Sequence, residues 1–410
     1  MDYTTLTQAI AFPTSLAEVD PNCFYTALQK VTDGRCTRGI RYPLALLLTL
    51  ILLTKLAGET KLSEAAHWVR LRGGWLNEHL HLERTRWPAP STFTSALERI
   101  DPQELTLVVQ QCLTQAESEG CFGDEPSRLA QQEERQHKAQ SALDGKTMRG
   151  TLSHEAAHQP SVHLLSLSEV QTRMVLAQRA VDSKDNESSA APDPLTALHI
   201  RGRIYTADAM HTHKKTCRCL TYNDGAYLLI AKNNQSGLPR DLELFFADPP
   251  ADRSTWRSAT TREKGHGRIE IRTPVASTDL NEYFARDWRG IAQVFRLERT
   301  VIEKGERRTS VVYGFTSLSP KQADPARLLA LLRAHWAIEN RLPWRRDVTL
   351  DEDHSQVRTR RAPQVLAVLN NALLALMDCL HVPNVPAQMR IFQACPLEAL
   401  RLFLVTLVKL

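Results

Sequence analysis

Runs of apolar residues predict helices at the beginning of the chain. The run Leu44–Leu53 is apolar almost throughout and is long enough for a buried helix. A second helix is expected over Lys61–Leu71, with Ser63 as its cap, and a third over Phe93–Ile100 after a proline-rich break. A short helix after such a break fits either the reading helix of a helix–turn–helix or a plain packing helix. We therefore expect an all-helical domain over residues 1–116.

The middle of the chain alternates between short strand-like runs and polar segments. Residues 117–140 are polar and charged without a sustained apolar period, which is typical of a linker. Five strand-like runs follow: Ser141–Leu143, His163–Leu167, Met174–Val181, Ile204–Ala207 and Tyr227–Ala231. Because helical segments lie between these runs, the pattern predicts an α/β core.

Residues 240–319 are expected to form mostly strands. Val294–Ile302 and Thr309–Phe315 flank the turn-like sequence Glu303–Glu306, and together they predict a β-hairpin. This strand-rich stretch differs from the mixed pattern that precedes it.

Helical patterns return toward the end of the chain. One helix is expected to begin at Asp324, with proline at its first position, and another covers Ala362–Leu380. Residues 381–410 are expected to form a helical tail. The predicted α/β core is thus discontinuous, with residues 141–239 and 320–380 on either side of the strand-rich stretch.

Composition narrows the class of protein without identifying it. The 410 residues are 42% hydrophobic and 24% charged, which excludes a disordered or fibrous chain and suggests two or three domains. The net charge of +5 permits a nucleic-acid partner but does not argue for one. The longest apolar run is too short to span a membrane and no secretory signal is visible, so a cytoplasmic protein with free thiols is expected.

Glu339 stands inside an apolar stripe. On a helix that turns 100° per residue, Leu328 and Leu332 lie within about 20° of Glu339. A buried carboxylate is costly without a partner, so Glu339 requires a metal ion, an arginine or hydrogen-bond donors. The alternative to a metal site is an ion pair with Arg333 or Arg346.

Two aspartates that follow strand-like runs could share a site with Glu339. Asp144 follows Ser141–Leu143, and Asp208 follows Ile204–Ala207. Ligands of α/β sheets bind at the carboxyl ends of strands. Each aspartate also has an ordinary interpretation, Asp144 in an Asp-Gly turn and Asp208 as a helix N-cap. Together with Glu339 they describe the oxygen ligand set that Mg²⁺ prefers, and two such ions support phosphoryl transfer.

Two other motifs are weaker. The sequence Gly145–Thr147 resembles the end of a phosphate-binding loop, but Gln140 stands where the first glycine of that loop is required. No nucleotide site is therefore expected. Four residues are spaced more tightly than the usual structural zinc ligands, which favours a surface helix over a zinc site: His211, His213, Cys217 and Cys219.

Basic residues gather around Glu339. Residues 333–361 contain seven arginines and five acidic residues. Arginine suits bidentate contacts to phosphate, although a salt-bridged surface is the alternative. Three of the acidic residues, Asp347, Asp351 and Asp353, lack the glycine of a calcium-binding loop and favour a solvated turn.

Four ordered motifs resemble those of bacterial insertion-sequence transposases, in the branch that includes the H-repeat-associated proteins. The motifs are Ala142–Gly150, Thr206–Met210, Lys264–Glu270 and His335–Asn340. The resemblance runs from about residue 12 to residue 380. Its N-terminal part is similar to the helical domain associated with that family, around Arg41–Leu44 and Pro90–Thr92.

The resemblance implies a ribonuclease-H-like fold that carries an Asp-Asp-Glu triad. Asp144 would lie on the first strand, Asp208 just after the fourth, and Glu339 on a later helix. Asp208 and Glu339 are 131 positions apart, and the strand-rich stretch 240–319 fits the β insertion that related transposases carry there. The implied enzyme is a DNA transposase with two Mg²⁺ ions, for which Mn²⁺ would substitute. It would cut the element's ends and join the freed 3′-hydroxyl to target DNA.

The resemblance also suggests residues that contact DNA. They are Lys146, Arg149, His266, Arg268, Arg333, His335 and Arg346. The wider superfamily places a tyrosine seven residues before its glutamate, an arginine four before and a lysine seven after, where this chain has Leu332, His335 and Arg346. Arg346 keeps the positive charge, whereas Leu332 cannot replace a tyrosine hydroxyl. His335 fits a core histidine equally well.

The expected partners are double-stranded DNA, as terminal inverted repeats and as target, and a second copy of the chain. Neither a membrane nor a nucleotide cofactor is expected, and the location would be the cytoplasm at the nucleoid. Three rival functions stay open: a nuclease with the same core but without strand transfer, a catalytically silent transposon-derived DNA-binding protein, and a structural zinc protein. The repeat and target sequences and the choice between cut-and-paste and copying stay open as well.

Overall fold

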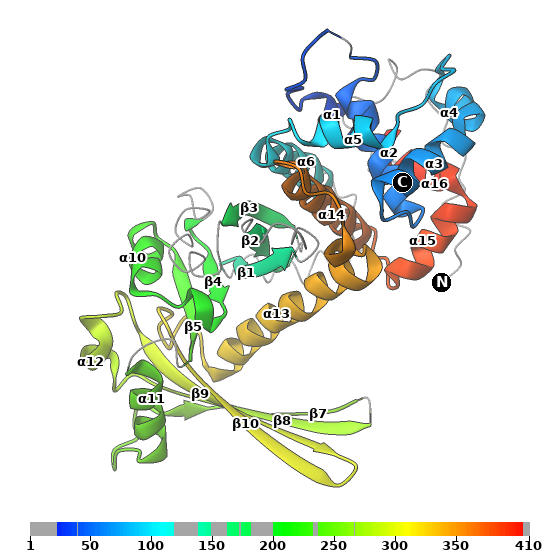
Figure 1. Cartoon of the computed structure of the whole chain (residues 1–410). Coiled ribbons are helices and arrows are strands. Elements are labelled where there is room, and N and C mark those ends of the chain that lie inside the picture. The colour runs from blue at the N-terminus through cyan, green and yellow to red at the C-terminus, as the bar shows by residue number, and fades with distance from the viewer. Residues whose placement is uncertain are drawn as a thin grey trace, which may run out of the picture.

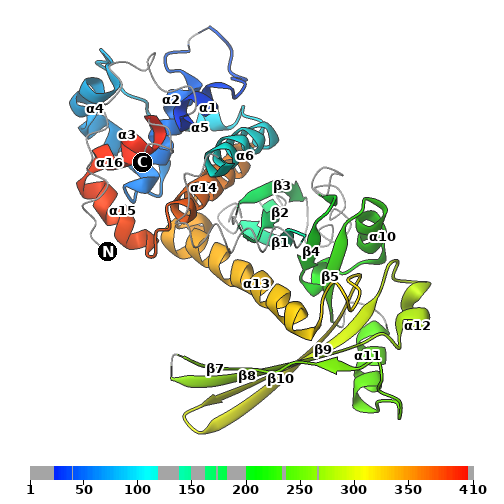
Figure 2. The same cartoon turned by 180° about the vertical axis from the view of Figure 1, so that it is seen from behind.

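A helical region and a set of long twisted strands lie at opposite ends of the molecule, and the rest of the sheet and the helix α13 (Pro325–Trp344) lie between them (Figure 1). The view from behind shows the same arrangement (Figure 2). This computed structural model describes residues 23–38, 40–118, 138–148, 162–171, 174–181, 200–232, 237–265 and 267–404. The architecture is mixed α/β, with a helical region at the N-terminus and a large mixed sheet.

Helices from both ends of the chain build the helical region. They are α1 (Phe24–Gln29), α2 (Leu44–Leu56), α3 (Leu62–Leu71), α4 (Gly73–Leu80), α5 (Pro90–Leu97), α6 (Pro102–Ser118), α14 (Ala362–Cys379), α15 (Val385–Ala394) and α16 (Pro396–Leu404). One hydrophobic core connects them. Within it the rings of Phe24 and Phe403 meet edge to face, with their centroids 5.8 Å apart. Residues 381–404 therefore pack with the N-terminal helices and do not form the separate tail that the sequence predicts.

The predicted helices of the N-terminal region form, with shifted ends. All thirteen residues of α2 are buried, which explains why that segment lacks a polar face. Lys61, not Ser63, precedes the first turn of α3, where its backbone N–H donates to the Glu64 carboxylate. The third helix begins at Pro90 because proline suits the first helical position, where no N–H is needed.

The helix α14 is apolar and lies in the core of this region. Among the described residues it is the one helix long and apolar enough to cross a membrane, and 89% of its apolar window is buried inside the protein. Such burial is typical of the core helix of a large fold.

Ten strands form a single sheet over the described ranges. They are β1 (Gln140–Met148), β2 (Val162–Glu169), β3 (Val175–Val181), β4 (Ile204–Ala207), β5 (Ala226–Ala231), β6 (Arg257–Ser258), β7 (Thr261–Gly265), β8 (Arg268–Ser277), β9 (Gln293–Glu303) and β10 (Glu306–Thr316). Their order is β3-β2-β1-β4-β5-β10-β9-β8-β6, and β7 pairs with β8. The pairs β1–β4 and β4–β5 are parallel and the others are antiparallel.

The five predicted core strands are all present. The strand β4 matches its predicted bounds, whereas β1 continues to Met148 instead of ending at Leu143. The reason is tertiary: β1 keeps pairing with β2 beyond the point where its ladder with β4 ends.

The stretch 240–319 is less uniformly β than predicted. The hairpin β9–β10 is confirmed, with Lys304 and Gly305 at positive φ in its turn. Two helices, α11 (Leu238–Ala247) and α12 (Asn281–Ala285), were missed. The buried residues of α11 recur every four positions, a helical period. Because β10 pairs with β5, these strands extend the core sheet and do not form a separate one.

Helices cover both faces of the sheet. The helix α13 (Pro325–Trp344) packs its leucines, Leu328 and Leu332 among them, against Ile204 of β4 and Leu228 of β5. On the other face α10 (Lys214–Tyr222), α11 and α12 enclose a second core. Since side chains alternate along a strand, the central strands contribute to both cores.

Candidate active site

Asp144 and Asp208 are placed side by side by the parallel pair β1–β4. The last paired residues in that ladder are Leu143 and Ala207, and the two aspartates come next on their strands. Neighbouring strands are about 4.8 Å apart. The two aspartates predicted from separate motifs therefore meet at the carboxyl end of this ladder.

Both aspartates lie on the sheet face that α13 covers. Gln140 and Lys146 have the same parity as Asp144 along β1, so the three side chains share one face. The Gln140 amide donates to the carbonyl oxygen of Leu331 in α13 at 2.8 Å, and Lys146 forms an ion pair with Asp347, just beyond that helix. The residues before and after Asp144 on this face of β1 thus contact α13 or the segment just beyond it, so Asp144 also faces α13.

The two contacts also show how α13 runs along β1. From Gln140 to Lys146 the strand advances in the direction in which the helical segment advances from Leu331 to Asp347. Position 339 is eight residues, or about 12 Å, beyond Leu331, while Asp144 is four strand residues, or about 13 Å, beyond Gln140. The backbone of residue 339 therefore lies alongside Asp144, although its side chain falls outside the described part of the chain.

Asp208 is held as an ionised carboxylate. Burial alone would raise its pKa, but the Lys232 ammonium at 3.0 Å and the backbone N–H of Ala209 lower it below the usual value. The predicted N-cap role is confirmed, because Asp208 caps the short 3₁₀ helix η5 (Ala209–His211). Its carboxylate also borders a cavity of about 850 Å³ that Lys232 and Tyr313 help to line.

Two buried histidines lie close to Asp208. Burial lowers the pKa of His335 and of His211 to about 4, so both rings are neutral near pH 7. Within the described part of the chain, neither ring nitrogen of His335 has a hydrogen-bond partner. Of the two interpretations that the sequence allows, the core residue is the one that applies to His335, and its ring lies near Asp208 rather than in solvent.

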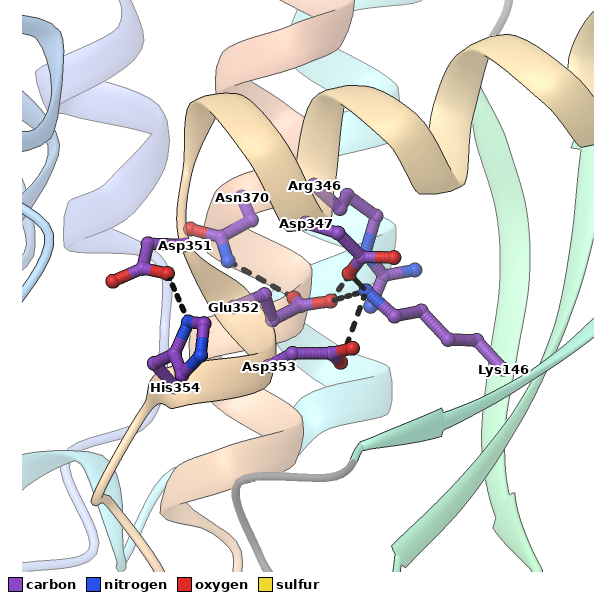
Figure 3. Close-up of polar contacts among 8 residues, drawn as sticks. All are labelled: Lys146, Arg346, Asp347, Asp351, Glu352, Asp353, His354 and Asn370. Carbon is purple, nitrogen blue, oxygen red and sulfur yellow. Dashed lines mark hydrogen bonds and ion pairs between the residues drawn. The ribbon is translucent and has the colours of Figure 1, made fainter.

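Lys146 and Arg346, predicted to contact DNA, are turned into the protein (Figure 3). Their side chains are less than a tenth exposed, and both bind the carboxylate of Glu352 at 2.7 Å. Because charged groups in a dry interior require partners, the local carboxylates hold these two cations away from solvent.

The other predicted DNA contacts differ in their surroundings. Arg333 is exposed on α13 and binds Glu263 of β7 at 3.0 Å. Arg268 on β8 binds Glu270 at 2.6 Å. Arg149 and His266 lie outside the described residues.

Sequence reasoning missed two glutamates that organise these cations. Glu352 stands in the acidic stretch predicted to be a solvated turn, yet it is only 3% exposed. Nothing in the local sequence distinguishes it from Asp351. Glu270 forms ion pairs with Arg268, Arg272 and Arg299. The alternation of charged residues along β8 is the sequence signal that could have identified it.

Among the described residues, His211, His213, Cys217 and Cys219 are not brought together as a metal site. His211 and Cys217 are buried, so the predicted surface helix is only partly on the surface. Over the described ranges, no group of three or more His, Cys, Asp or Glu side chains is placed to hold a metal ion. The side chain of Glu339 is not among the described side chains.

The donor chemistry of the paired aspartates fits a hard divalent cation. Asp208 is ionised and half-buried and borders a cavity, and Asp144 stands beside it on the next strand. Carboxylate oxygens are the ligands that Mg²⁺ and Mn²⁺ take. A glutamate from position 339 would complete a three-carboxylate set.

Comparison with known protein families matches most of the chain. The family described as "Transposase DDE domain" matches residues 135–377. The domain described as "DDE_Tnp_1-associated" matches residues 25–113.

Individual relatives agree with these matches. The chain is 32% identical over 265 residues to an uncharacterised protein in the dhlA 3′ region of Xanthobacter autotrophicus, covering 64% of this chain and 83% of that one. It is 30% identical to the "Putative transposase YncI" of Escherichia coli O157:H7, covering 58% of this chain and 62% of that one. It is 27% identical to the "H repeat-associated putative transposase YhhI" of Escherichia coli K12, covering 58% and 63%. The aligned region thus spans less than two thirds of both Escherichia coli proteins.

Proposed function

Since the chain belongs to the transposase DDE-domain family, we propose that it cuts the ends of an insertion sequence and joins the freed 3′-hydroxyl to target DNA. Its catalytic residues are Asp144, Asp208 and Glu339. The strands β1 to β5 and the helix α13 form a ribonuclease-H-like core in this proposal, and β6 to β10 extend it.

The observation that carries the proposal is the register of β1 and β4. It brings two aspartates from motifs 64 residues apart to neighbouring positions, on the face covered by the helix that contains Glu339. The interpretation of Asp144 as a turn residue does not apply, because Asp144 lies within a paired strand.

Asp144, Asp208 and Glu339 would hold two Mg²⁺ ions, with Mn²⁺ as a substitute. Bound divalent cations would supply Lewis-acid activation of the attacking oxygen and stabilisation of the leaving oxygen. DDE domains of this family are in general dependent on divalent metal ions. No nucleotide is required.

The protein's own residues prepare this site for an anionic substrate. Lys232 keeps Asp208 ionised and contributes a positive charge at the rim of the cavity. The neutral ring of His335 fills space near Asp208 without adding a charge. The cavity beside Asp208 leaves room for a DNA strand to approach the carboxylates.

We assign DNA binding to surfaces on the same side of the sheet as α13, where Arg333 and Arg268 are exposed. The predicted contacts Arg149 and His266 remain part of the proposal, whereas the buried ring of His335 does not contact DNA in it. For Lys146 and Arg346 the ion pairs with Glu352 favour a supporting role instead. Within the helical region, the N-terminal helices α1 to α6 would bind the terminal repeats.

The proposed assembly is a homodimer that pairs two element ends in the cytoplasm, at the nucleoid. As domains we propose the helical region, a linker between α6 and β1, the core, and its extension by the strands after residue 250. The C-terminal helices after residue 380 join the helical region, because they share its core.

The test is cleavage of labelled DNA that carries the element's own ends, in Mg²⁺ or Mn²⁺, by the wild type and by Glu339→Gln. We expect metal-dependent cutting and joined products from the wild type and background levels from the variant. Glu398→Gln, which alters an ion pair with Arg401 on α16, is the matched control and should cut normally. Cutting without joining would indicate a nuclease. Equal DNA binding with no cutting by any protein would indicate a DNA-binding protein.

A further inference from the structure

A buried ion-pair network centres on Glu352 (Figure 3). One carboxylate oxygen of Glu352 accepts hydrogen bonds from Lys146 Nζ and Arg346 Nε, each at 2.7 Å. The other oxygen accepts from the Asn370 side-chain amide at 2.9 Å. Asp347 and Asp353 complete the set of carboxylates around Lys146.

The members of the network come from separate elements. Lys146 belongs to β1, and Arg346 to the π-helical segment η6 (Arg345–Thr349) that continues α13. Glu352 begins the 3₁₀ helix η7 (Glu352–His354), and Asn370 lies in α14. One carboxylate therefore joins a sheet strand, the end of α13 and a core helix.

Two of these residues are close in the chain to proposed metal ligands. Lys146 is two residues after Asp144 on the same face of β1, and Arg346 is seven residues after Glu339. The segment that holds Arg346 is also fixed to α14, because Arg345 binds Asp378 at 2.6 Å. The network thus spans the same two elements whose separation sets the distance between the first and third ligands.

Stability alone is a weak reason for such a network. Two buried cations and their carboxylates lose solvation, and apolar side chains of similar volume often replace a buried ion pair without loss of stability. Apolar side chains cannot form hydrogen bonds. The distances and directions of hydrogen bonds fix how β1 lies relative to the end of α13. Groups that orient metal ligands commonly alter metal affinity or activity by 10- to 100-fold.

We propose that Glu352 is a positioning residue, which holds Lys146 and Arg346 so that Asp144 and Glu339 face each other at the distance that two metal ions require. This inference rests on the proposed function, because it assumes that both acids bind metal. Glu352 touches neither the metal ions nor the DNA.

The network also faces the N-terminal helices. The Lys55 side chain of α2 is buried, and burial lowers its pKa to about 8 against the opposing effect of Glu352 and Asp351. The Lys55 ammonium of the helical region therefore interacts electrostatically with Glu352, the residue that we propose positions the metal ligands.

The test uses the full-length chain with Glu352→Asp, which keeps the charge but shortens the side chain, and with Glu352→Gln, which keeps the shape but removes the charge. Glu398→Asp and Glu398→Gln are matched controls on α16. Three quantities are measured for each protein: Mn²⁺ affinity from the electron paramagnetic resonance signal of free Mn²⁺, the Mn²⁺ concentration for half-maximal cleavage, and the thermal midpoint of unfolding.

For Glu352→Asp we expect Mn²⁺ affinity to fall by roughly 10-fold or more, with a matching rise in the Mn²⁺ concentration for half-maximal cleavage and a midpoint within a few degrees of the wild type. Excess Mn²⁺ should restore much of its cleavage, which it cannot do for Glu339→Gln. If Glu352→Gln fails to fold, Glu352→Asp alone decides.

Two results would overturn the proposal. One is wild-type Mn²⁺ affinity in a folded Glu352→Asp protein. The other is a decrease in affinity that only follows the decrease in folded protein. In both cases the proposed function survives if the wild type cleaves, whereas a wild type that neither binds Mn²⁺ nor cleaves overturns both.

Discussion

At the scale of single residues, the acids of this chain differ by what surrounds them. Asp208 is half-buried and keeps its charge through Lys232, whereas Glu352 is almost fully buried and keeps its charge through Lys146 and Arg346. Burial raises the pKa of any carboxyl group, so the neighbouring cations decide the outcome. In Glu352 these cations lower the pKa to about 2 despite the burial.

This shift makes stability depend on pH. The pKa of Glu352 is lower in the folded protein than the ordinary value of 4.5, so its contribution is complete above about pH 4.5 and is lost as the pH falls toward 2. A difference of about 2.5 pKa units corresponds to roughly 3 kcal/mol. We expect Glu352→Gln to lower the free energy of unfolding most at neutral pH, and the difference from the wild type to shrink between pH 4.5 and 2.

Urea unfolding of both proteins at a series of pH values measures this, with Glu398→Gln as the control that should show little change. A difference between the wild type and Glu352→Gln that stays constant with pH would contradict the prediction.

At the scale of elements, the strand β10 joins the core sheet to its extension. It pairs with β5 on one side and with β9 on the other. Gly314 lies at this junction, opposite Ile230 and Phe295. A Cβ atom there would overlap the carbonyl oxygen of Leu229 and the ring of Phe295. Glycine is therefore required by close packing and not by backbone conformation.

We expect Gly314→Ala to lower the free energy of unfolding by about 1–3 kcal/mol, because a packed junction cannot accept an added methyl group without shifting its neighbours. Thermal unfolding monitored by circular dichroism measures this. Gly74→Ala in α4 is the matched control, since no atom lies within 4 Å of its added Cβ. Equal midpoints for the two variants would show that the junction relaxes without strain.

At the scale of the whole molecule, α13 and the extended sheet share one arginine-rich face. Arg268, Arg272 and Arg299 surround Glu270, and Arg333 of α13 binds Glu263 beside them. Four arginines against two glutamates leave a net charge of +2 among these six residues. Arginines fixed by such pairs are suited to phosphate groups of a DNA duplex.

The double variant Arg268→Ala/Arg299→Ala should therefore weaken DNA binding uniformly across sequences. Arg272 still pairs with Glu270 in this variant, so no buried charge is left alone. The slope of log Kd against log salt concentration should decrease by about 1 for each phosphate that the variant no longer binds. Fluorescence anisotropy at several salt concentrations measures the slope. Arg218→Ala on α10, on the opposite face of the sheet, should leave the slope unchanged. An equal effect of both variants would argue against the proposal that the arginine-rich face binds DNA.

Local patterns along the sequence determined much of the fold and the candidate acids. A continuous apolar run predicted α2, helical patterns predicted α13 and α14, and strand-like runs around a glycine turn predicted the β9–β10 hairpin, because these signals depend on neighbours within a few residues. The motifs around Asp144 and Asp208, taken together with the family resemblance, were enough to single out both acids.

Only the tertiary structure decided which distant segments meet. The register of β1 with β4 places Asp144 beside Asp208, and the burial of Glu352 turns a stretch with the pattern of a solvated turn into the centre of a network. Burial and pairing depend on contacts between residues far apart in the chain, such as Lys146 and Glu352, and no local pattern records them. For the same reason the sequence predicted that Arg346 contacts DNA, whereas in the structure its guanidinium is buried in an ion pair with Glu352.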